Sequence, residues 1–145
     1  MRKILHFDSS RENYHCDAAA VWCFDQRFDA AFRRFLKRLR VHHCDQIRIA
    51  GGAKCFASPE SEVEREFVLG QIETSIRLHA TELVVLMVHS DCGGYGGLAR
   101  FAGDTDAERT HHASELAKAA EFVSRKLPGV AVRSFFMNFD GVWEV

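Results

Sequence analysis

The sequence of 145 residues lacks a long apolar run and has almost no net charge. No stretch approaches the roughly 20 apolar residues that a membrane-spanning helix needs. The amino-terminal residues turn polar and charged after Phe7, which leaves no apolar core for a signal peptide. Nineteen basic and twenty acidic side chains give a formal charge of -1, so no field of one sign would attract nucleic acid or a membrane. We therefore expect a cytoplasmic protein whose partner is a small molecule or a protein.

The five cysteines do not have the spacing of a secreted disulfide scaffold, and their number is odd. In a reducing compartment, such cysteines are more often buried, catalytic or metal-bound than disulfide-bonded. The chain also lacks internal repeats, low-complexity tracts and linkers. Its hydrophobic fraction of 47% is enough to fill a core. A single domain over residues 1–145 is therefore expected.

Apolar runs alternate with amphipathic stretches along most of the chain, which predicts an α/β fold with a central, mainly parallel sheet flanked by helices. Apolar runs predict buried strands at residues 18–24 and 81–89, and residues 46–50 predict a further strand that runs into a glycine turn. Helical spacing predicts helices at residues 27–40, 58–80 and 113–127. Residues 130–145 favour a carboxyl-terminal hairpin or edge strand with a turn at Asp140–Gly141. Residues 3–7 are compatible with a short edge strand.

Two details of the helices follow from the same patterns. The second predicted helix begins at Ser58 before Pro59, and its apolar stripe consists of Val63, Phe67, Ile72 and Ile76. A glycine-rich loop follows the third strand over residues 90–112, and we expect its tail to start the next helix. We expect the pair His111–His112, at the end of this loop, to be solvated at the start of a surface helix.

Side chains that bind metals follow two of the predicted strands. The first strand ends in "CFDQR", with Cys23, Asp25 and Arg27, and the third ends in "HSDC", with His89 and Cys92. Parallel strands connected by right-handed crossovers end at the same edge of the sheet, where sites of open α/β folds gather. The two motifs can therefore share one site.

Two thiolates and one imidazole are a plausible ligand set for zinc, with a fourth position left open for water. The carboxylate of Asp25 could fill that position or hydrogen-bond its occupant, and Arg27 could hold the carboxylate in a bidentate pair. Free cysteines also pack as small hydrophobic residues, so the two motifs alone leave a core role open. The other cysteines, Cys16, Cys44 and Cys55, have no partner spacing and are interpreted as structural.

Together the motifs resemble those of the β-class carbonic anhydrases, which bind zinc through a Cys-x-Asp-x-Arg segment and a later His-x-x-Cys-Gly. "IRIAGG", "FVLGQIETSIRLHATELVVLMVHSDCGG" and "FFMNFDGVWEV" are similar to further segments of the family, in the same order from about Ala18 onwards. The resemblance implies a β-carbonic-anhydrase-like fold with Zn²⁺ on Cys23, His89 and Cys92. It implies Asp25 and Arg27 as the catalytic dyad. Gly93, in the position of the family's glycine, would line the substrate-binding site.

The resemblance implies reversible hydration of CO2 to bicarbonate and assembly into a homodimer or a larger homo-oligomer. Three features depart from the family: Gln26 replaces a serine, Ile49 replaces an asparagine, and about seventeen residues precede Ala18 where the family has longer helices. Two alternatives therefore stay open. One is a non-catalytic zinc-binding homologue, and the other is a hydrolase of CS2 or COS on the same fold.

Overall fold

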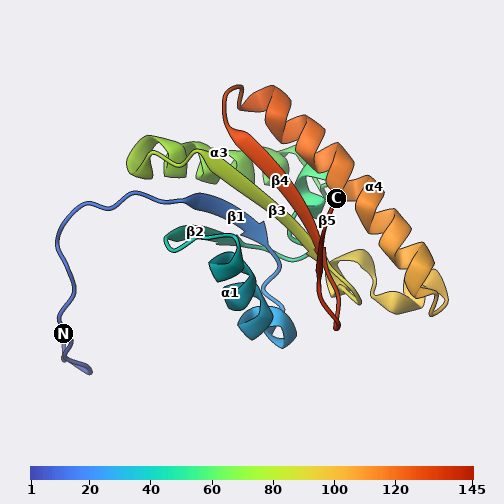
Figure 1. Cartoon of the computed structure of the whole chain (residues 1–145), viewed down its shortest axis with the longest axis horizontal. Coiled ribbons are helices and arrows are strands. Elements are labelled where there is room, and N and C mark those ends of the chain that lie inside the picture. The colour runs from blue at the N-terminus through green and yellow to red at the C-terminus, as the bar shows by residue number, and fades with distance from the viewer.

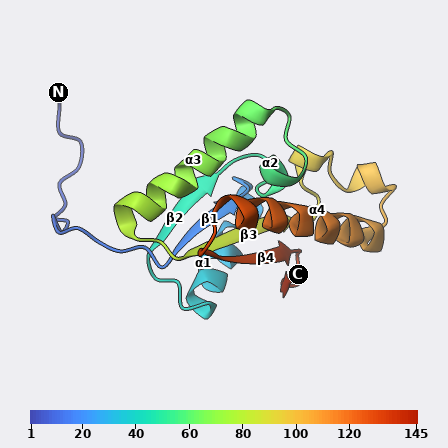
Figure 2. The ribbon, with the colours of Figure 1, turned by 90° about the horizontal axis from the view of Figure 1, so that it is seen from above.

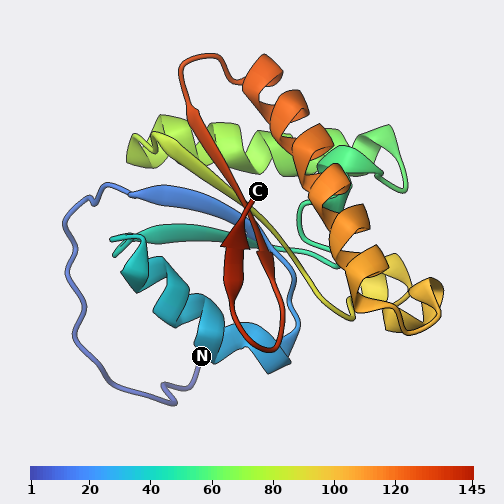
Figure 3. The same ribbon diagram turned by 45° about the vertical axis from the view of Figure 1, so that its right-hand side comes forward.

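A five-stranded sheet in the order β2-β1-β3-β4-β5 forms the centre of the computed structural model, which describes residues 1–145 (Figure 1). The four strands β2, β1, β3 and β4 are parallel, and β5 pairs antiparallel with β4 as an edge hairpin (Figure 3). This arrangement confirms the predicted mainly parallel α/β fold with a carboxyl-terminal hairpin. The strands are β1 (Ala18–Trp22), β2 (Cys44–Arg48), β3 (Leu83–His89), β4 (Ala131–Met137) and β5 (Val142–Glu144).

Helices cover both faces of the sheet (Figures 1 and 2). One face packs against α1, and the other packs against the remaining three helices. Three short 3₁₀ turns connect these elements to the strands. The helices are α1 (Asp29–Arg38), α2 (Lys54–Ala57), α3 (Glu62–His79) and α4 (Thr105–Lys126), and the turns are η1 (Gln26–Phe28), η2 (Gly93–Tyr95) and η3 (Leu98–Phe101). None of the helices is long and apolar enough to cross a membrane.

Successive side chains of β1 enter opposite cores because side chains alternate across a strand. Ala18, Ala20 and Trp22 lie in the core beneath α1, where the Trp22 ring stacks on Phe32 at a centroid distance of 5.2 Å. Ala19 and Val21 lie in the core beneath α3 and α4. All five residues are buried. The continuous apolar run therefore arises from a strand that is covered on both faces, as expected from the sequence.

The predicted start and apolar stripe of α3 are wrong. The hydroxyl of Ser61, not Ser58, caps the helix by accepting from the backbone N–H of Glu64 at 3.2 Å. Ile72 is buried, but Val63 and Phe67 are 75% and 64% exposed. At about 100° per residue, Phe67 and Ile72 lie about 140° apart around the helix. The predicted stripe therefore combined two different faces, and the buried face is Val68, Leu69, Ile72 and Ser75.

The predicted surroundings of His112 are also wrong. Asp104 caps α4 by accepting from the backbone N–H groups of Asp106 and Ala107, so the helix begins at Thr105 and the histidine pair does not open it. His112 consequently lies inside the helix and faces the sheet, where its ring stacks on Phe136 at 5.6 Å between centroids. Its side chain is fully buried.

No strand forms at residues 3–7, and residues 1–15 are exposed. The chain enters the sheet at β1, which lies between β2 and β3. The amino-terminal segment instead extends away from the sheet (Figure 1). It first bonds to the rest of the chain through the N–H groups of Cys16 and Asp17, which donate to the carbonyls of His79 and His43.

Candidate metal centre

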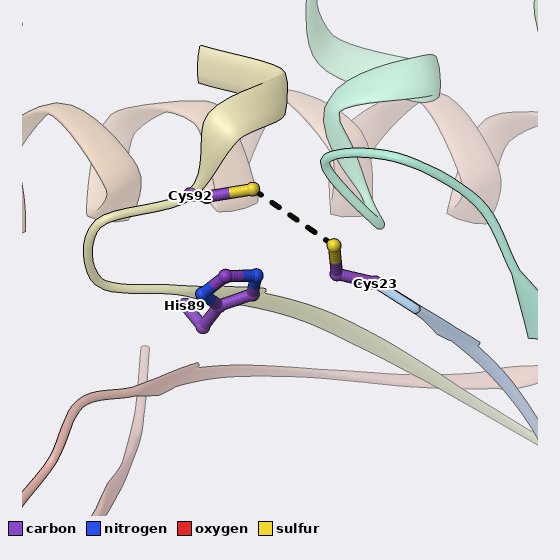
Figure 4. Close-up of side chains that lie close together, drawn as sticks. All are labelled: Cys23, His89 and Cys92. Carbon is purple, nitrogen blue, oxygen red and sulfur yellow. Dashed lines mark hydrogen bonds between the residues drawn. The ribbon is translucent and has the colours of Figure 1, made fainter. Parts of the chain in front are cut away.

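The carboxyl ends of β1 and β3 bring together the three predicted metal ligands (Figure 4). Cys23 directly follows β1, His89 is the last residue of β3, and Cys92 precedes η2. One donor atom from each lies within 4.8 Å of the others, and the two sulfurs are 4.0 Å apart. Two thiolates on a tetrahedral zinc ion, at about 2.3 Å each, lie about 3.8 Å from one another. The sulfur pair therefore already has nearly the spacing that zinc requires.

The imidazole of His89 is oriented with one nitrogen free for a metal. Its Nδ1 lies 2.8 Å from the carbonyl oxygen of Ser90, so Nδ1–H is the donor and Nε2 keeps its lone pair. Nε2 is buried and has no hydrogen-bond partner. Trp22 and Phe28 hold the ring in place, at centroid distances of 5.5 and 4.8 Å. A buried nitrogen without a partner is costly, and a metal ion would satisfy it.

The two thiols are buried, and their sulfurs lie within hydrogen-bonding distance of each other. The contact with Cys92 is the main cause that lowers the pKa of Cys23 to about 4, with smaller contributions from His89 and from the backbone N–H groups of Asp25 and Gly51. The same contact, together with burial, raises the pKa of Cys92. The contact therefore favours the thiolate form of Cys23. A zinc ion would replace the proton between the two sulfurs and bind both as thiolates.

Asp25 and Arg27 form the predicted dyad beside these ligands. The Nε atom of Arg27 donates to both carboxylate oxygens of Asp25 at 3.1 and 3.0 Å, and Nη2 donates to Oδ2 at 2.7 Å. Hydrogen bonds from the Arg27 side chain are the main reason that the pKa of Asp25 is lowered, although partial burial acts the other way. Oδ2 lies 3.9 Å from Nε2 of His89. An ionised carboxylate therefore lies near the unpaired Nε2 of His89.

Arg27 also connects the two motifs, a contact that the sequence did not predict. Its Nη1 and Nη2 atoms donate to a carboxylate oxygen and to the backbone oxygen of Asp91, each at 2.9 Å. Asp91 lies between the predicted ligands His89 and Cys92, and its other carboxylate oxygen accepts from the N–H of Leu98. One guanidinium thus fixes the loops after β1 and β3 to each other.

The side chain of Glu108 supports the loop between His89 and Cys92, a role that the sequence did not indicate. Its buried carboxylate accepts from the hydroxyl of Ser90 and from the N–H of Asp91, the latter at 2.7 Å. Glu108 lies in the polar run "TDAERTHH", where the next helix is expected to start but which has no apolar periodicity to indicate a buried face. Only the position of α4 against β3 and β4 makes this carboxylate a partner of the loop.

The glycines after Cys92 differ in what they contribute. Gly93, predicted to line the substrate, is exposed, and a Cβ atom there would meet no atom within 4 Å. A Cβ atom on Gly94 would lie 2.6 Å from the backbone nitrogen of Gly51. Gly94 is therefore the position where the backbone after Cys92 passes close to the turn after β2. The role of Gly93 stays a prediction.

Comparison with known proteins shows the family to which the chain belongs. The model of a family described as "putative carbonic anhydrase" matches residues 13–145. An uncharacterized protein of Rickettsia conorii is 23% identical over 99% of this chain and 81% of its own length. A β-carbonic anhydrase of Trichomonas vaginalis superposes with a TM-score of 0.59 at 14% identity, covering 96% of this chain and 87% of its own.

A carbonic anhydrase of Glaciozyma antarctica has the same fold. It superposes with a TM-score of 0.58 at 17% identity and covers 91% of this chain and 83% of its own. The family match spans nearly the whole chain, including both ligand motifs. The chain belongs to the putative carbonic anhydrase family, in agreement with the resemblance in its sequence.

Proposed function

We propose that the protein is a zinc-dependent carbonic anhydrase that interconverts CO2 and bicarbonate. The observation that carries the proposal is the convergence of Cys23, His89 and Cys92 beside an ionised Asp25. Family membership supports the same reaction. On this proposal, residues 1–145 form one carbonic-anhydrase-like domain with CO2 or bicarbonate as its small-molecule substrate.

The two thiolates and Nε2 of His89 would hold the zinc ion. Bound zinc supplies a Lewis acid that lowers the pKa of a coordinated water from 15.7 to about 7. Oδ2 of Asp25 is the nearest carboxylate oxygen to Nε2 of His89, so it would accept a hydrogen bond from the reacting water and orient it. Arg27 would keep the carboxylate ionised and directed by engaging both of its oxygens.

Apolar side chains beside the dyad suit an apolar substrate. Phe24, between Cys23 and Asp25, and Phe139, in the turn between β4 and β5, are both largely exposed. Phe139 also lies 5.6 Å from the guanidinium carbon of Arg27 and 5.0 Å from the Phe28 ring. These rings would give CO2 an apolar approach to the site. CS2 and COS are apolar as well, and the tests therefore include them.

We further propose a homo-oligomer in a reducing compartment such as the cytoplasm. Ile4, Leu5 and Phe7 are exposed on the amino-terminal segment, where a second copy of the chain would bury them. All five cysteines are free, and oxidation would join Cys23 to Cys92 in place of zinc binding. Sedimentation of the reduced protein tests the assembly: a mass of one 16.4 kDa chain contradicts it.

The experiment for the activity combines metal analysis with stopped-flow CO2 hydration on the wild type and on Asp25→Asn. We expect zinc bound to the three ligands in both proteins. Hydration should fall about 100-fold or more in Asp25→Asn because the neutral amide is a weaker hydrogen-bond acceptor than the ionised carboxylate. Glu121→Ala, an exposed change on α4, is the control and should retain full activity.

The other outcomes separate the alternatives. A zinc-loaded protein that hydrolyses CS2 or COS but leaves CO2 untouched is a hydrolase of sulfur analogues. A zinc-loaded protein inactive on all three substrates is a non-catalytic zinc-binding homologue. Absence of zinc from the ligands under reducing conditions removes the basis of the whole proposal.

A further inference from the structure

A second group of side chains of the metal-binding types lies at the amino-terminal ends of the strands, opposite the first group. Cys16 precedes β1, Asp45 belongs to β2, and His79 is the last residue of α3. One donor atom from each lies within 4.8 Å of the others. The three residues come from distant parts of the sequence, and Cys16 has no partner spacing that would have indicated a site.

The surrounding contacts hold these side chains in place. The N–H of Cys16 donates to the carbonyl oxygen of His79 at 3.0 Å, which fixes the cysteine beside the end of α3. Nδ1 of His79 lies 2.6 Å from Oδ2 of Asp45, and the hydroxyl of Ser75 donates to the same oxygen at 2.6 Å. The ring of Tyr14 stacks on His79 at 4.3 Å between centroids.

The group is partly open to solvent. Cys16 is buried, whereas the side chains of Asp45 and His79 are 23% and 24% exposed. Both line a cavity of about 220 Å³ that also borders Ser75 and Gln71. An ion can therefore reach the carboxylate and imidazole from the cavity, which also has room for a coordinated water.

We propose that Cys16, Asp45 and His79 bind a second divalent metal ion of the zinc type. One sulfur, one nitrogen and one oxygen donor suit a borderline cation, because Mg²⁺ and Ca²⁺ prefer oxygen ligands alone. A thiolate and a carboxylate balance the charge of a dication, and the thiol proton is released to solvent on binding. Neighbouring ligands on tetrahedral zinc lie about 3.3–3.8 Å apart, so small side-chain rotations would complete the site.

A metal ion bound at this site would attach the amino-terminal segment to the rest of the fold. An ion there would join three segments: the residues before β1, the strand β2 and the end of α3. The proposal is independent of carbonic anhydrase activity, because it uses none of the ligands at the other edge of the sheet.

The test counts zinc per chain after dialysis against metal-free reducing buffer, with the wild type and four variants. We expect two equivalents in the wild type and one in Cys16→Ser. Asp45→Asn, which keeps the volume of the side chain, should also bind one and gives a second reading if the serine variant is poorly folded. Cys44→Ser is the matched control and should retain two. Cys92→Ser should lose only the ion at the other site.

Substitution with ¹¹³Cd provides a readout that does not depend on activity. The wild type should show two resonances, one from a site with two sulfurs and one from a site with a single sulfur, and Cys16→Ser should lose only the second. The proposal is overturned if the zinc count is the same in Cys16→Ser, Asp45→Asn and the wild type. One equivalent that is lost in Cys16→Ser but kept in Cys92→Ser would support this second site and refute the first.

Discussion

Replacement of Glu108 by alanine tests whether its carboxylate holds the loop between His89 and Cys92 in place. Glu108 is 1% exposed and accepts from the Ser90 hydroxyl and the Asp91 N–H. Hydrogen bonds to a charged group contribute roughly 1.5–3 kcal/mol each, and removal of their acceptor leaves buried donors unpaired. We therefore expect the free energy of unfolding to fall by about 3–5 kcal/mol.

Urea unfolding followed by far-ultraviolet circular dichroism measures this change. For an m-value of about 2 kcal/mol/M, the midpoint should shift by about 2 M at unchanged m. Zinc affinity should fall about 10–100-fold, because Ser90 and Asp91 lie between two of the proposed ligands. Glu121→Ala, exposed on the same helix, should stay within about 0.5 kcal/mol of the wild type. A Glu108→Ala protein as stable as this control, with unchanged zinc affinity, would refute the reasoning.

Three further predictions follow from the geometry. Arg27→Met should retain zinc and lose about 100-fold in kcat/KM for CO2 hydration because Asp25 is no longer held; unchanged kcat/KM contradicts this orienting role. Burial lowers the pKa of His112 from 6.5 to about 4, so its contribution to stability is present above pH 6.5 and is lost as the pH falls through 4. This loss amounts to about 3 kcal/mol at 1.36 kcal/mol per pKa unit. His112→Phe should remove that part of the pH dependence in urea titrations, and equal slopes in both proteins would refute it. Gly94→Ala should destabilise the fold by about 1–3 kcal/mol because its Cβ would meet Gly51 at 2.6 Å, whereas Gly93→Ala should be nearly neutral; similar unfolding midpoints for the two would contradict the close approach.

The sheet and the grouping of the ligand residues could be predicted because they depend on patterns local to each strand. β1 and β3 are apolar runs covered on both faces, and the ligand-type residues follow each run directly. Parallel pairing then places Cys23 and His89 at one edge whatever the details of packing.

Features that depend on how helices pack against the sheet could not be predicted. Glu108 and His112 are polar residues whose burial is decided by the orientation of α4, and no periodicity in the sequence indicates it. The exposure of Phe67 depends on which face of α3 meets the sheet. Cys16 and His79 are 63 positions apart in the chain and meet only because α3 ends beside the start of β1.

The most direct test of the central claim is oxygen-18 exchange between labelled bicarbonate and water, measured by mass spectrometry on the zinc-loaded protein and on Cys92→Ser. We predict exchange far above the uncatalysed rate with the wild type and background exchange with the variant, because Cys92 is a proposed zinc ligand. Background exchange with a wild-type protein that carries zinc on Cys23, His89 and Cys92 would contradict the assignment as a carbonic anhydrase.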